Sequence, residues 1–251
     1  MPTIKLTLEY DGTRFNGWQI QSGKRRTVQG EIEKALSRIF QQETRVIGSG
    51  RTDSGVHARA QIAHLKTRSR MTPHQILKAL NSLLPQDIAV LRAKEVLSDF
   101  HAQYSAKSKI YRYTILNAGT RSPLARQFST FYPYPLNLRL MRREARDLLG
   151  KKDFRSFQAT DPAVQSDTPE KTSIRTIKKL EIKKTGSFIA IDIEADGFLY
   201  KMVRNIVGTL LKIGSGKLPE GSMKRILQKK NRRAAGFTAP ARGLCLWEVK
   251  Y

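Results

Sequence analysis

Apolar and polar positions alternate at the start of the chain and then repeat with helical spacing. From Ile4 to Tyr10 every second residue is apolar or aromatic, which predicts a strand with one buried face. Apolar stripes after Thr27 and from Thr72–Pro73 predict two helices, each with a threonine as N-cap. Short apolar runs predict three further strands, at residues 45–47, 60–65 and 88–91. The order β-α-β-β-α-β is that of the split-βαβ, or ferredoxin-like, unit, which packs helices on one face of an antiparallel sheet and leaves the other free.

The rest of the chain repeats this outline. Tyr111 and Tyr113 share one face of an alternating strand that ends at Leu116, and they are either core aromatics or a surface for a ligand. Next come an irregular connection at 117–135 and a helix at 138–149 that is capped by Gly150. Two strands at 174–182 and 188–195, a helix at 202–211 that is ended by Gly214, and a closing strand at 245–251 complete the chain. The polar stretch 158–173 is predicted to be a loop or insertion.

The net charge of the chain indicates which class of molecule it binds. The 251 residues carry 46 Lys+Arg against 21 Asp+Glu, a net charge of +25. Such an excess indicates a polyanionic partner, with nucleic acid as first candidate. A membrane surface is the second, but neither a basic amphipathic helix nor a lipidation signal supports it. The single cysteine, Cys245, excludes an internal disulfide and Cys-x-x-Cys zinc sites. With no apolar run near 20 residues and no secretory signal before the first strand, we expect a cytoplasmic protein.

Three glycines fall within eight residues in the segment Gly48–Ala58, which we call the signature loop. They permit tight turns and close approach of a ligand to the backbone. Arg51 lies two positions before Asp53, so this carboxylate is expected to stay ionised and to be a candidate nucleophile. The alternative is an ordinary Asp-Ser-Gly turn. His57 is either a general base or, as we favour, a structural histidine that fixes the loop.

Several other side chains allow two interpretations. Arg204 borders the apolar stripe of its helix and either needs a carboxylate partner or lies on the surface. Phe15 and Trp18 are either part of the core, which we favour, or a ligand platform. Two groups of cationic side chains either are solvated or contact RNA phosphates. The first consists of Arg139, Arg142, Arg143 and Arg146, and the second lies within residues 224–233. Phosphate binding is favoured for the second group.

The signature loop resembles the Gly-Arg-Thr-Asp-x-Gly-Val-His-Ala motif of the tRNA pseudouridine synthase A family. Residues 198–208 resemble the family's Phe-Leu-x-x-Met-Val-Arg-Asn-Ile-Val-Gly motif, residues 109–113 its Lys/Arg-x-Tyr-x-Tyr strand, and residues 239–244 its Ala-Pro-Ala-x-Gly-Leu segment. The resemblance extends over almost the whole chain. The chain departs from the family pattern at a few positions. Ser49 and Ser54 stand where alanine is common, Lys201 where histidine is common, and Gln103–Tyr104 where Arg-Phe is common.

This resemblance implies an α+β fold of two similar ferredoxin-like halves, residues 1–105 and 106–251, with antiparallel sheets side by side around a central basic cleft. It implies isomerisation of uridine to pseudouridine at positions 38, 39 and 40 of the tRNA anticodon stem-loop, without metal, cofactor or nucleotide. Asp53 would be the nucleophile, attacking C6 of uracil or C1′ of ribose, and Arg204 its ion-pair partner. Tyr111 would stack on the base and is a candidate acceptor of the C5 proton. Arg51 would displace the base or grip the RNA backbone. Family members are homodimers.

Two other functions fit the same residues. A non-catalytic basic RNA-binding protein would use the cationic surface without chemistry, although an acid at Asp53 weakens phosphate binding. An aspartate-dependent hydrolase would release free uracil instead of isomerising it.

Overall fold

A computed structural model describes residues 1–23, 25–160 and 172–251. The described chain forms two compact units. Unit 1 contains Met1–Lys109 and Cys245–Tyr251, and unit 2 contains Ile110–Leu244. Most of the loop predicted at 158–173 lies outside the described residues. Each unit is considered separately below.

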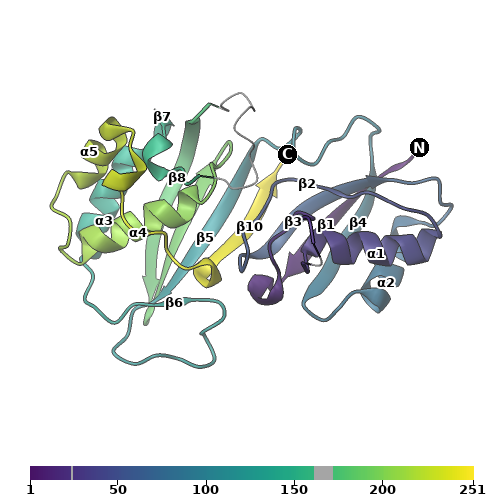
Figure 1. Cartoon of the computed structure of the whole chain (residues 1–251), viewed down its shortest axis with the longest axis horizontal. Coiled ribbons are helices and arrows are strands. Elements are labelled where there is room, and N and C mark those ends of the chain that lie inside the picture. Colours follow the sequence, from purple (N-terminus) through teal and green to yellow (C-terminus); the bar gives the residue numbers. More distant parts are fainter. Residues whose placement is uncertain (24, 161–171) are drawn as a thin grey trace. The chain divides into compact units, whose positions relative to one another are not determined.

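Unit 1 is built on a mostly antiparallel sheet with the strand order β4-β1-β3-β10 and with β2 paired to β3 (Figure 1). Strands β1–β3, β1–β4 and β2–β3 are antiparallel, whereas β10 runs parallel to β3. The elements of this unit, in chain order, are β1 (Thr3–Tyr10), α1 (Val28–Phe40), β2 (Ile47–Gly48), β3 (His57–Lys66), α2 (Pro73–Leu83), β4 (Ile88–Val96) and β10 (Leu244–Lys250).

Helices α1 and α2 cover one face of this sheet (Figure 1). Their starts are as predicted, because Thr27 accepts a hydrogen bond from the backbone of Gly30 and Thr72 forms a capping box with Gln75. The opposite face was expected to be free, but part of it is covered. The ammonium group of Lys5 lies 4.3 Å from the ring centroid of Tyr251 and 5.3 Å from that of Phe100, so these aromatics cover part of the face.

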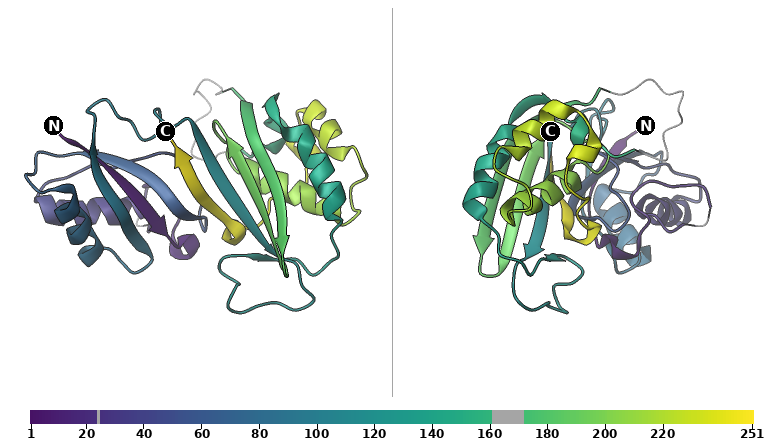
Figure 2. Two further views of the ribbon diagram at one scale, coloured as in Figure 1. Left: turned by 180° about the vertical axis from the view of Figure 1, so that it is seen from behind. Right: turned by 60° about the vertical axis from the view of Figure 1, so that its left-hand side comes forward.

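Unit 2 has the strand order β5-β9-β8-β7, with β6 paired to β5. Its helices lie together on one face of the strands (Figure 2), and α3 contacts both α4 and α5. The strand β5 begins at the end of unit 1. The elements, in chain order, are β5 (Ser108–Leu116), β6 (Thr130–Phe131), α3 (Leu138–Ala145), β7 (Gly150–Asp153), β8 (Ile174–Thr185), β9 (Phe188–Ala195), α4 (Met202–Gly214) and α5 (Ser222–Lys229).

Several predicted boundaries are wrong. The strand expected at 45–47 is only Ile47–Gly48, and the strand expected at 88–91 extends to Val96. That strand is not fully buried, because it is an edge strand and Leu91 is 46% exposed. The helix expected to reach residue 149 ends at Ala145 and continues as a 3-10 turn, after which Gly150 opens the unpredicted strand β7. The differences in β2, β4 and β7 depend on pairing with other strands, which local periodicity does not contain.

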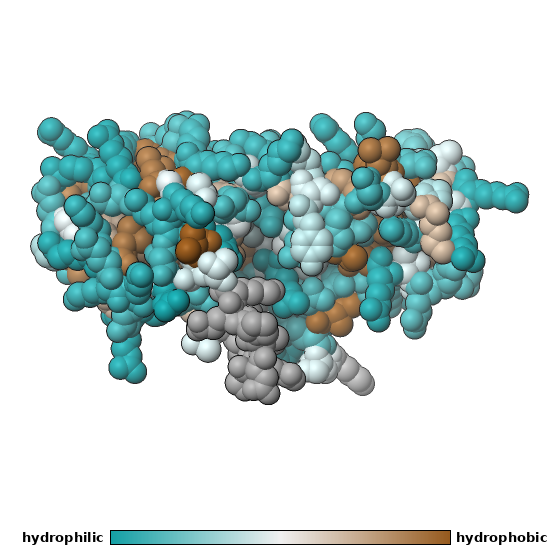
Figure 3. Space-filling view, turned by 90° about the horizontal axis from the view of Figure 1, so that it is seen from above, coloured by the Kyte–Doolittle hydropathy of each residue, from teal (hydrophilic) through white to brown (hydrophobic). Residues whose placement is uncertain are grey.

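The aromatic pair after β1 belongs to the core, as favoured. Phe15 and Trp18 are each only 2% exposed. A Cβ atom on Gly48 would lie 2.6 Å from the Trp18 ring, so the indole packs directly on the backbone at the start of the signature loop. Among the described residues, no helix is long and apolar enough to span a bilayer. The face of the molecule in Figure 3 is mostly hydrophilic, with hydrophobic side chains in separate patches.

Candidate active site

The signature loop lies in unit 1 and connects β2 to β3. It is held mainly by backbone groups of the segment after β1. The Trp18 N–H donates to the Thr52 carbonyl (3.1 Å), and the Gly55 N–H donates to the Phe15 carbonyl (3.2 Å). Within the loop, the Val56 N–H donates to the backbone carbonyl of Asp53 (3.1 Å), which closes a turn that begins at Asp53. The loop therefore presents Asp53 from a tightly fixed backbone.

Two glycines outside the loop make this close approach possible. A Cβ atom on Gly12 would lie 2.0 Å from the Val56 carbonyl oxygen, and one on Gly17 would lie 2.5 Å from the Thr52 oxygen. Gly17 also has a positive φ of 90°. Any larger residue at either position would push the loop away from β1.

Buried side chains complete the support of the loop. The Tyr10 phenol and the Thr52 hydroxyl are hydrogen-bonded at 2.8 Å, and burial raises the pKa of the phenol, which therefore stays neutral. The Ser49 hydroxyl donates to Gln61 (2.7 Å), whose amide donates in turn to the Gly50 carbonyl (2.9 Å). Ser49, at a position where the resemblance predicts alanine, thus adds a buried hydrogen bond to the support of the loop.

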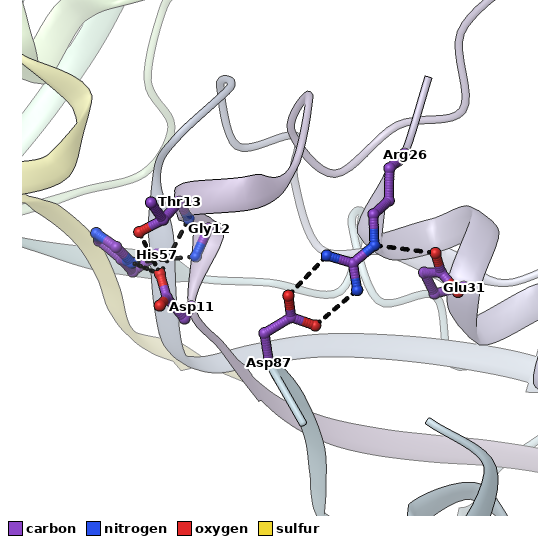
Figure 4. Close-up of polar contacts among 7 residues, drawn as sticks. All are labelled: Asp11, Gly12, Thr13, Arg26, Glu31, His57 and Asp87. Carbon is purple, nitrogen blue, oxygen red and sulfur yellow. Dashed lines mark hydrogen bonds and ion pairs between the residues drawn. The ribbon is translucent and has the colours of Figure 1, made fainter. Parts of the chain in front are cut away.

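His57 has a structural role, as favoured. Its side chain is buried, and the Gly12 N–H donates to its Nδ1 atom (3.1 Å), as Figure 4 shows. The same ring nitrogen lies 3.1 Å from Asp11 Oδ1. These contacts join the first residue of β3 to the turn after β1, so the imidazole fixes the end of the signature loop.

Arg26 fixes the segment that leads into α1. Its guanidinium forms a bidentate pair with Asp87 (2.7 and 2.8 Å) and contacts Glu31 (3.1 Å), as Figure 4 shows. The same group lies 4.2 Å from the ring centroid of Phe15. Bidentate pairing restricts the planar guanidinium strongly, so Arg26 holds the chain that supports the signature loop.

The two predicted charges of the loop differ in exposure. Asp53 is half-buried, whereas Arg51 is exposed. Lys109, at the end of unit 1, supplies a further cation: its Nζ atom lies 3.3 Å from the position that a Cβ on Gly50 would occupy. Sequence reasoning gave Lys109 no role, although it is the first residue of the Lys/Arg-x-Tyr-x-Tyr motif. The ammonium group of Lys109 therefore lies against the backbone of the signature loop.

Tyr111 and Arg204 both lie in unit 2. Tyr111, on β5, is 8% exposed and packs edge-to-face on Phe198, with ring centroids 5.1 Å apart. Arg204 lies in the first turn of α4, and its Nε atom donates to the Ala239 carbonyl (2.7 Å). The residue before this helix, Lys201, has a left-handed backbone with φ of 56°. A strained residue at this point sets the direction in which α4 begins.

The structure thus assigns the four predicted site residues to two units. Arg51 and Asp53 belong to unit 1, and Tyr111 and Arg204 to unit 2. The ion pair between Asp53 and Arg204 stays a prediction.

One predicted phosphate ligand has a structural role instead. Arg232, in the basic cluster 224–233, donates to the Gly236 carbonyl (2.8 Å) and to the side-chain oxygens of Asn205 (2.9 Å) and Thr238 (3.1 Å). Burial lowers the pKa of this guanidinium. Three of its hydrogen bonds are made to groups within the protein and the side chain is half-buried, so Arg232 supports the structure of unit 2.

Comparisons with known proteins identify the family of this chain. A family model described as tRNA pseudouridine synthase matches residues 7–105 and 145–251. Proteins named tRNA pseudouridine synthase A from Thermoanaerobacter sp. (strain X514) and Moorella thermoacetica are 44% and 45% identical over 251 and 252 residues, covering 100% of both chains in each case. The protein of that name from Bacillus pumilus is 45% identical over 250 residues, 99% of this chain and 98% of its own.

A solved archaeal complex, titled as a box H/ACA sRNP Nop10–Cbf5 complex, contains a chain matched over 92% of this protein and 59% of its own length. Its sequence identity is 12% and its TM-score 0.34, too low to establish a common fold. The sequence relatives and the family model are sufficient without it: this chain belongs to the tRNA pseudouridine synthase family, a family of isomerases.

Proposed function

We propose that this protein converts uridine to pseudouridine at positions 38, 39 and 40 in the anticodon stem-loop of tRNA. The observation that carries the proposal is Asp53, which lies at the centre of a loop fixed by glycines and backbone hydrogen bonds, within a motif that matches the family. Full-length identity of 44% to a protein named tRNA pseudouridine synthase A supports tRNA as the substrate. The net charge of +25 favours binding of such a polyanion.

The reaction is an isomerisation in which atoms are rearranged without an external donor. The N1–C1′ bond of the nucleotide breaks, the uracil ring rotates, and C5 bonds to C1′. The proton lost from C5 is balanced by one gained at N1. A uridine within a stem must first be extruded, at a cost of about a few kcal/mol. In this proposal the Asp53 carboxylate then forms a transient covalent bond to C6 of the base or to C1′ of the sugar.

The other site residues support this step. A guanidinium can bind a carboxylate through two parallel hydrogen bonds, and we assign this role to Arg204 toward Asp53. Its Nε is already bound to Ala239, which fixes the plane of the group. Tyr111 stacks on the extruded uracil, because aromatic stacking offsets the lost stacking in the stem, and it is the candidate acceptor of the C5 proton. The exposed Arg51 displaces the base or grips the RNA backbone.

The architecture implied by the family completes the proposal. It comprises two similar ferredoxin-like halves, 1–105 and 106–251, a basic cleft, a cytoplasmic location and a homodimer that binds tRNA. In unit 1, the antiparallel order β4-β1-β3-β2 supports the first half. A monomer found by light scattering at micromolar concentration would contradict the dimer.

The direct experiment is to incubate the purified protein with unmodified tRNA and to map pseudouridine by chemical derivatisation and mass spectrometry. We expect product at the three positions and none with Asp53→Asn, which should retain tRNA affinity because it removes a negative charge from a cationic surface. Equal product with both proteins would disprove the role of Asp53. Binding without product would favour the non-catalytic RNA-binding protein, and free uracil in chromatography would indicate a hydrolase.

A further inference from the structure

Residues 236–243, which we call the strap, follow α5 in the chain and contact both helix α4 and strand β5 within unit 2. At its first end the strap touches the helix backbone directly. A Cβ atom on Gly208 would lie 1.8 Å from the Phe237 carbonyl oxygen, and one on Gly236 would lie 2.7 Å from backbone atoms of Gly208. The two glycines therefore permit an approach that no other residue pair allows.

The strap holds Arg204 at two points. The Ala239 N–H donates to the Arg204 carbonyl (3.1 Å), and the Ala239 carbonyl accepts from the Arg204 Nε atom (2.7 Å). The first contact fixes the strap to the helix backbone, and the second fixes the orientation of the guanidinium plane. A displacement of Ala239 would thus be transmitted to the charged group of Arg204.

A buried polar network locks this end of the strap. The Asn205 side chain is 0% exposed, and its oxygen accepts from Thr238 (2.7 Å) and Arg232 (2.9 Å). Its amide nitrogen donates to the Phe157 carbonyl (2.7 Å). Arg232 also binds the Gly236 carbonyl (2.8 Å). Both polar atoms of the Asn205 side chain are therefore satisfied by segments distant in sequence, which makes the arrangement rigid.

At its second end the strap is bound to β5 by Tyr113, which is fully buried and on the same face as Tyr111. The Tyr113 phenol donates to the Pro240 carbonyl (2.8 Å) and lies 2.6 Å from the Thr130 hydroxyl. Because the phenol has a single O–H, which it donates to the Pro240 carbonyl, the Thr130 hydroxyl is the donor in the second bond. Burial raises the pKa of Tyr113 to about 12, so the phenol remains a donor at neutral pH.

We propose that the strap is a positioning device that sets the Arg204 guanidinium relative to Tyr111, with Tyr113 and Thr238 as positioning residues of the isomerisation. The inference rests on the proposed function. Neither residue needs to touch the RNA: Tyr113 acts through Pro240, and Thr238 through Asn205 and Arg232. Geometry errors of about 1 Å at reacting groups reduce rates up to about a hundredfold, so loss of either contact should lower turnover.

The test compares loss of the Tyr113 phenol with loss of the Thr130 hydroxyl that binds it. Tyr113→Phe removes both the bond to the strap and the bond to Thr130, whereas Thr130→Val removes only the second. We expect Tyr113→Phe to lower kcat for pseudouridine formation at least about tenfold, with tRNA Kd close to wild type and only a modest fall in melting temperature, since the buried Pro240 carbonyl loses its donor. Thr238→Val should lower kcat in the same way. Thr130→Val should leave kcat close to wild type.

A double-mutant cycle separates positioning from general damage. If Tyr113 acts through Arg204, Tyr113→Phe should cost little further in an Arg204→Lys background, because the geometry that it maintains is already lost. Additive losses, an equal loss in Thr130→Val, or wild-type kcat in Tyr113→Phe would each overturn the role of the strap while the wild-type protein remains active. A wild-type protein that forms no pseudouridine would instead overturn the proposed function.

Discussion

The signature loop of unit 1 and the Arg204 region of unit 2 are fixed by different means. The loop is held chiefly by backbone hydrogen bonds, such as those from Trp18 to Thr52 and from Gly55 to Phe15. Arg204 is held by the strap, which in turn depends on the side chains of Asn205 and Tyr113. A segment held by backbone hydrogen bonds accepts most substitutions, except where a new Cβ atom would collide with a neighbouring backbone. A buried side-chain network fails when any one member is changed, because each partner is then left unsatisfied.

The largest expected effect on stability comes from the backbone contact between α4 and the strap. Gly208→Ala would place a Cβ atom 1.8 Å from the Phe237 oxygen, so the strap must move. We expect a loss of about 3 kcal/mol in the free energy of unfolding, since overpacking outweighs the gain of about 1 kcal/mol in helix propensity. Urea unfolding would measure it. Gly119→Ala is the matched control, because nothing lies within 4 Å of its Cβ position.

Removal of the central amide should come next. Asn205→Ala leaves the Phe157 carbonyl, Thr238 and Arg232 without their shared partner in a buried site. Unsatisfied buried groups predict a loss of about 2 kcal/mol, together with reduced kcat. The control is Asn81→Ala, since Asn81 binds only the backbone of Val90 in unit 1. It should lower stability without lowering kcat, and an equal fall in kcat for both variants would contradict the special role of the Arg204 network.

The signature loop should be less sensitive to loss of one side-chain bond. Thr52→Val removes the hydroxyl that is bound to Tyr10 (2.8 Å) but keeps the backbone hydrogen bond from the Trp18 N–H to the carbonyl of residue 52. We expect a loss of about 1 kcal/mol in the free energy of unfolding. Comparison with Asn205→Ala by the same denaturation assay would sharpen the contrast. If Thr52→Val cost more than Asn205→Ala, the loop would not be chiefly a backbone structure.

The smallest effect is expected at the surface of unit 2. Arg143 and Glu220 form an ion pair whose side chains are 57% and 61% exposed. Exposed pairs contribute at most about 1 kcal/mol and are screened by salt, so Arg143→Gln should change stability by less than about 0.5 kcal/mol. Melting curves at low and high salt would test this. A larger, salt-independent loss would show that Arg143 contributes through packing rather than through its charge.

Elements with strong local signals were predicted well. Thr27 and Thr72 fixed the starts of α1 and α2, and alternation located β1, β8 and β9. The strand β7 was missed because Gly150–Asp153 has no apolar alternation and exists through its pairing with β8. The length of β4 was underestimated for a similar reason, since its polar second half is held by pairing with β1. Pairing between distant segments adds stability that no local window contains.

In the candidate site, too, local sequence motifs were informative, whereas contacts made by packing could not be predicted. Asp53, Tyr111 and Arg204 were singled out because each lies in a contiguous motif, and their roles remain proposals. Arg232 was interpreted as a phosphate ligand because it lies in a run of cations, yet it satisfies the carbonyl of Gly236 and the side chain of Asn205. A charge run shows only that cations are present. Whether a cation faces solvent or a buried oxygen depends on packing.

The sequence by itself determined the family, the periodic helices and strands, the cationic character of the protein and the residues that are candidates for chemistry, because each is a local or additive property of the chain. Only the tertiary structure decided which polar side chains support those candidates. The bond from Tyr113 to Pro240 joins residues 127 positions apart, and that between Tyr10 and Thr52 spans 42. Such pairs form when burial leaves a polar group no water to bind, and this condition arises only once the chain has folded.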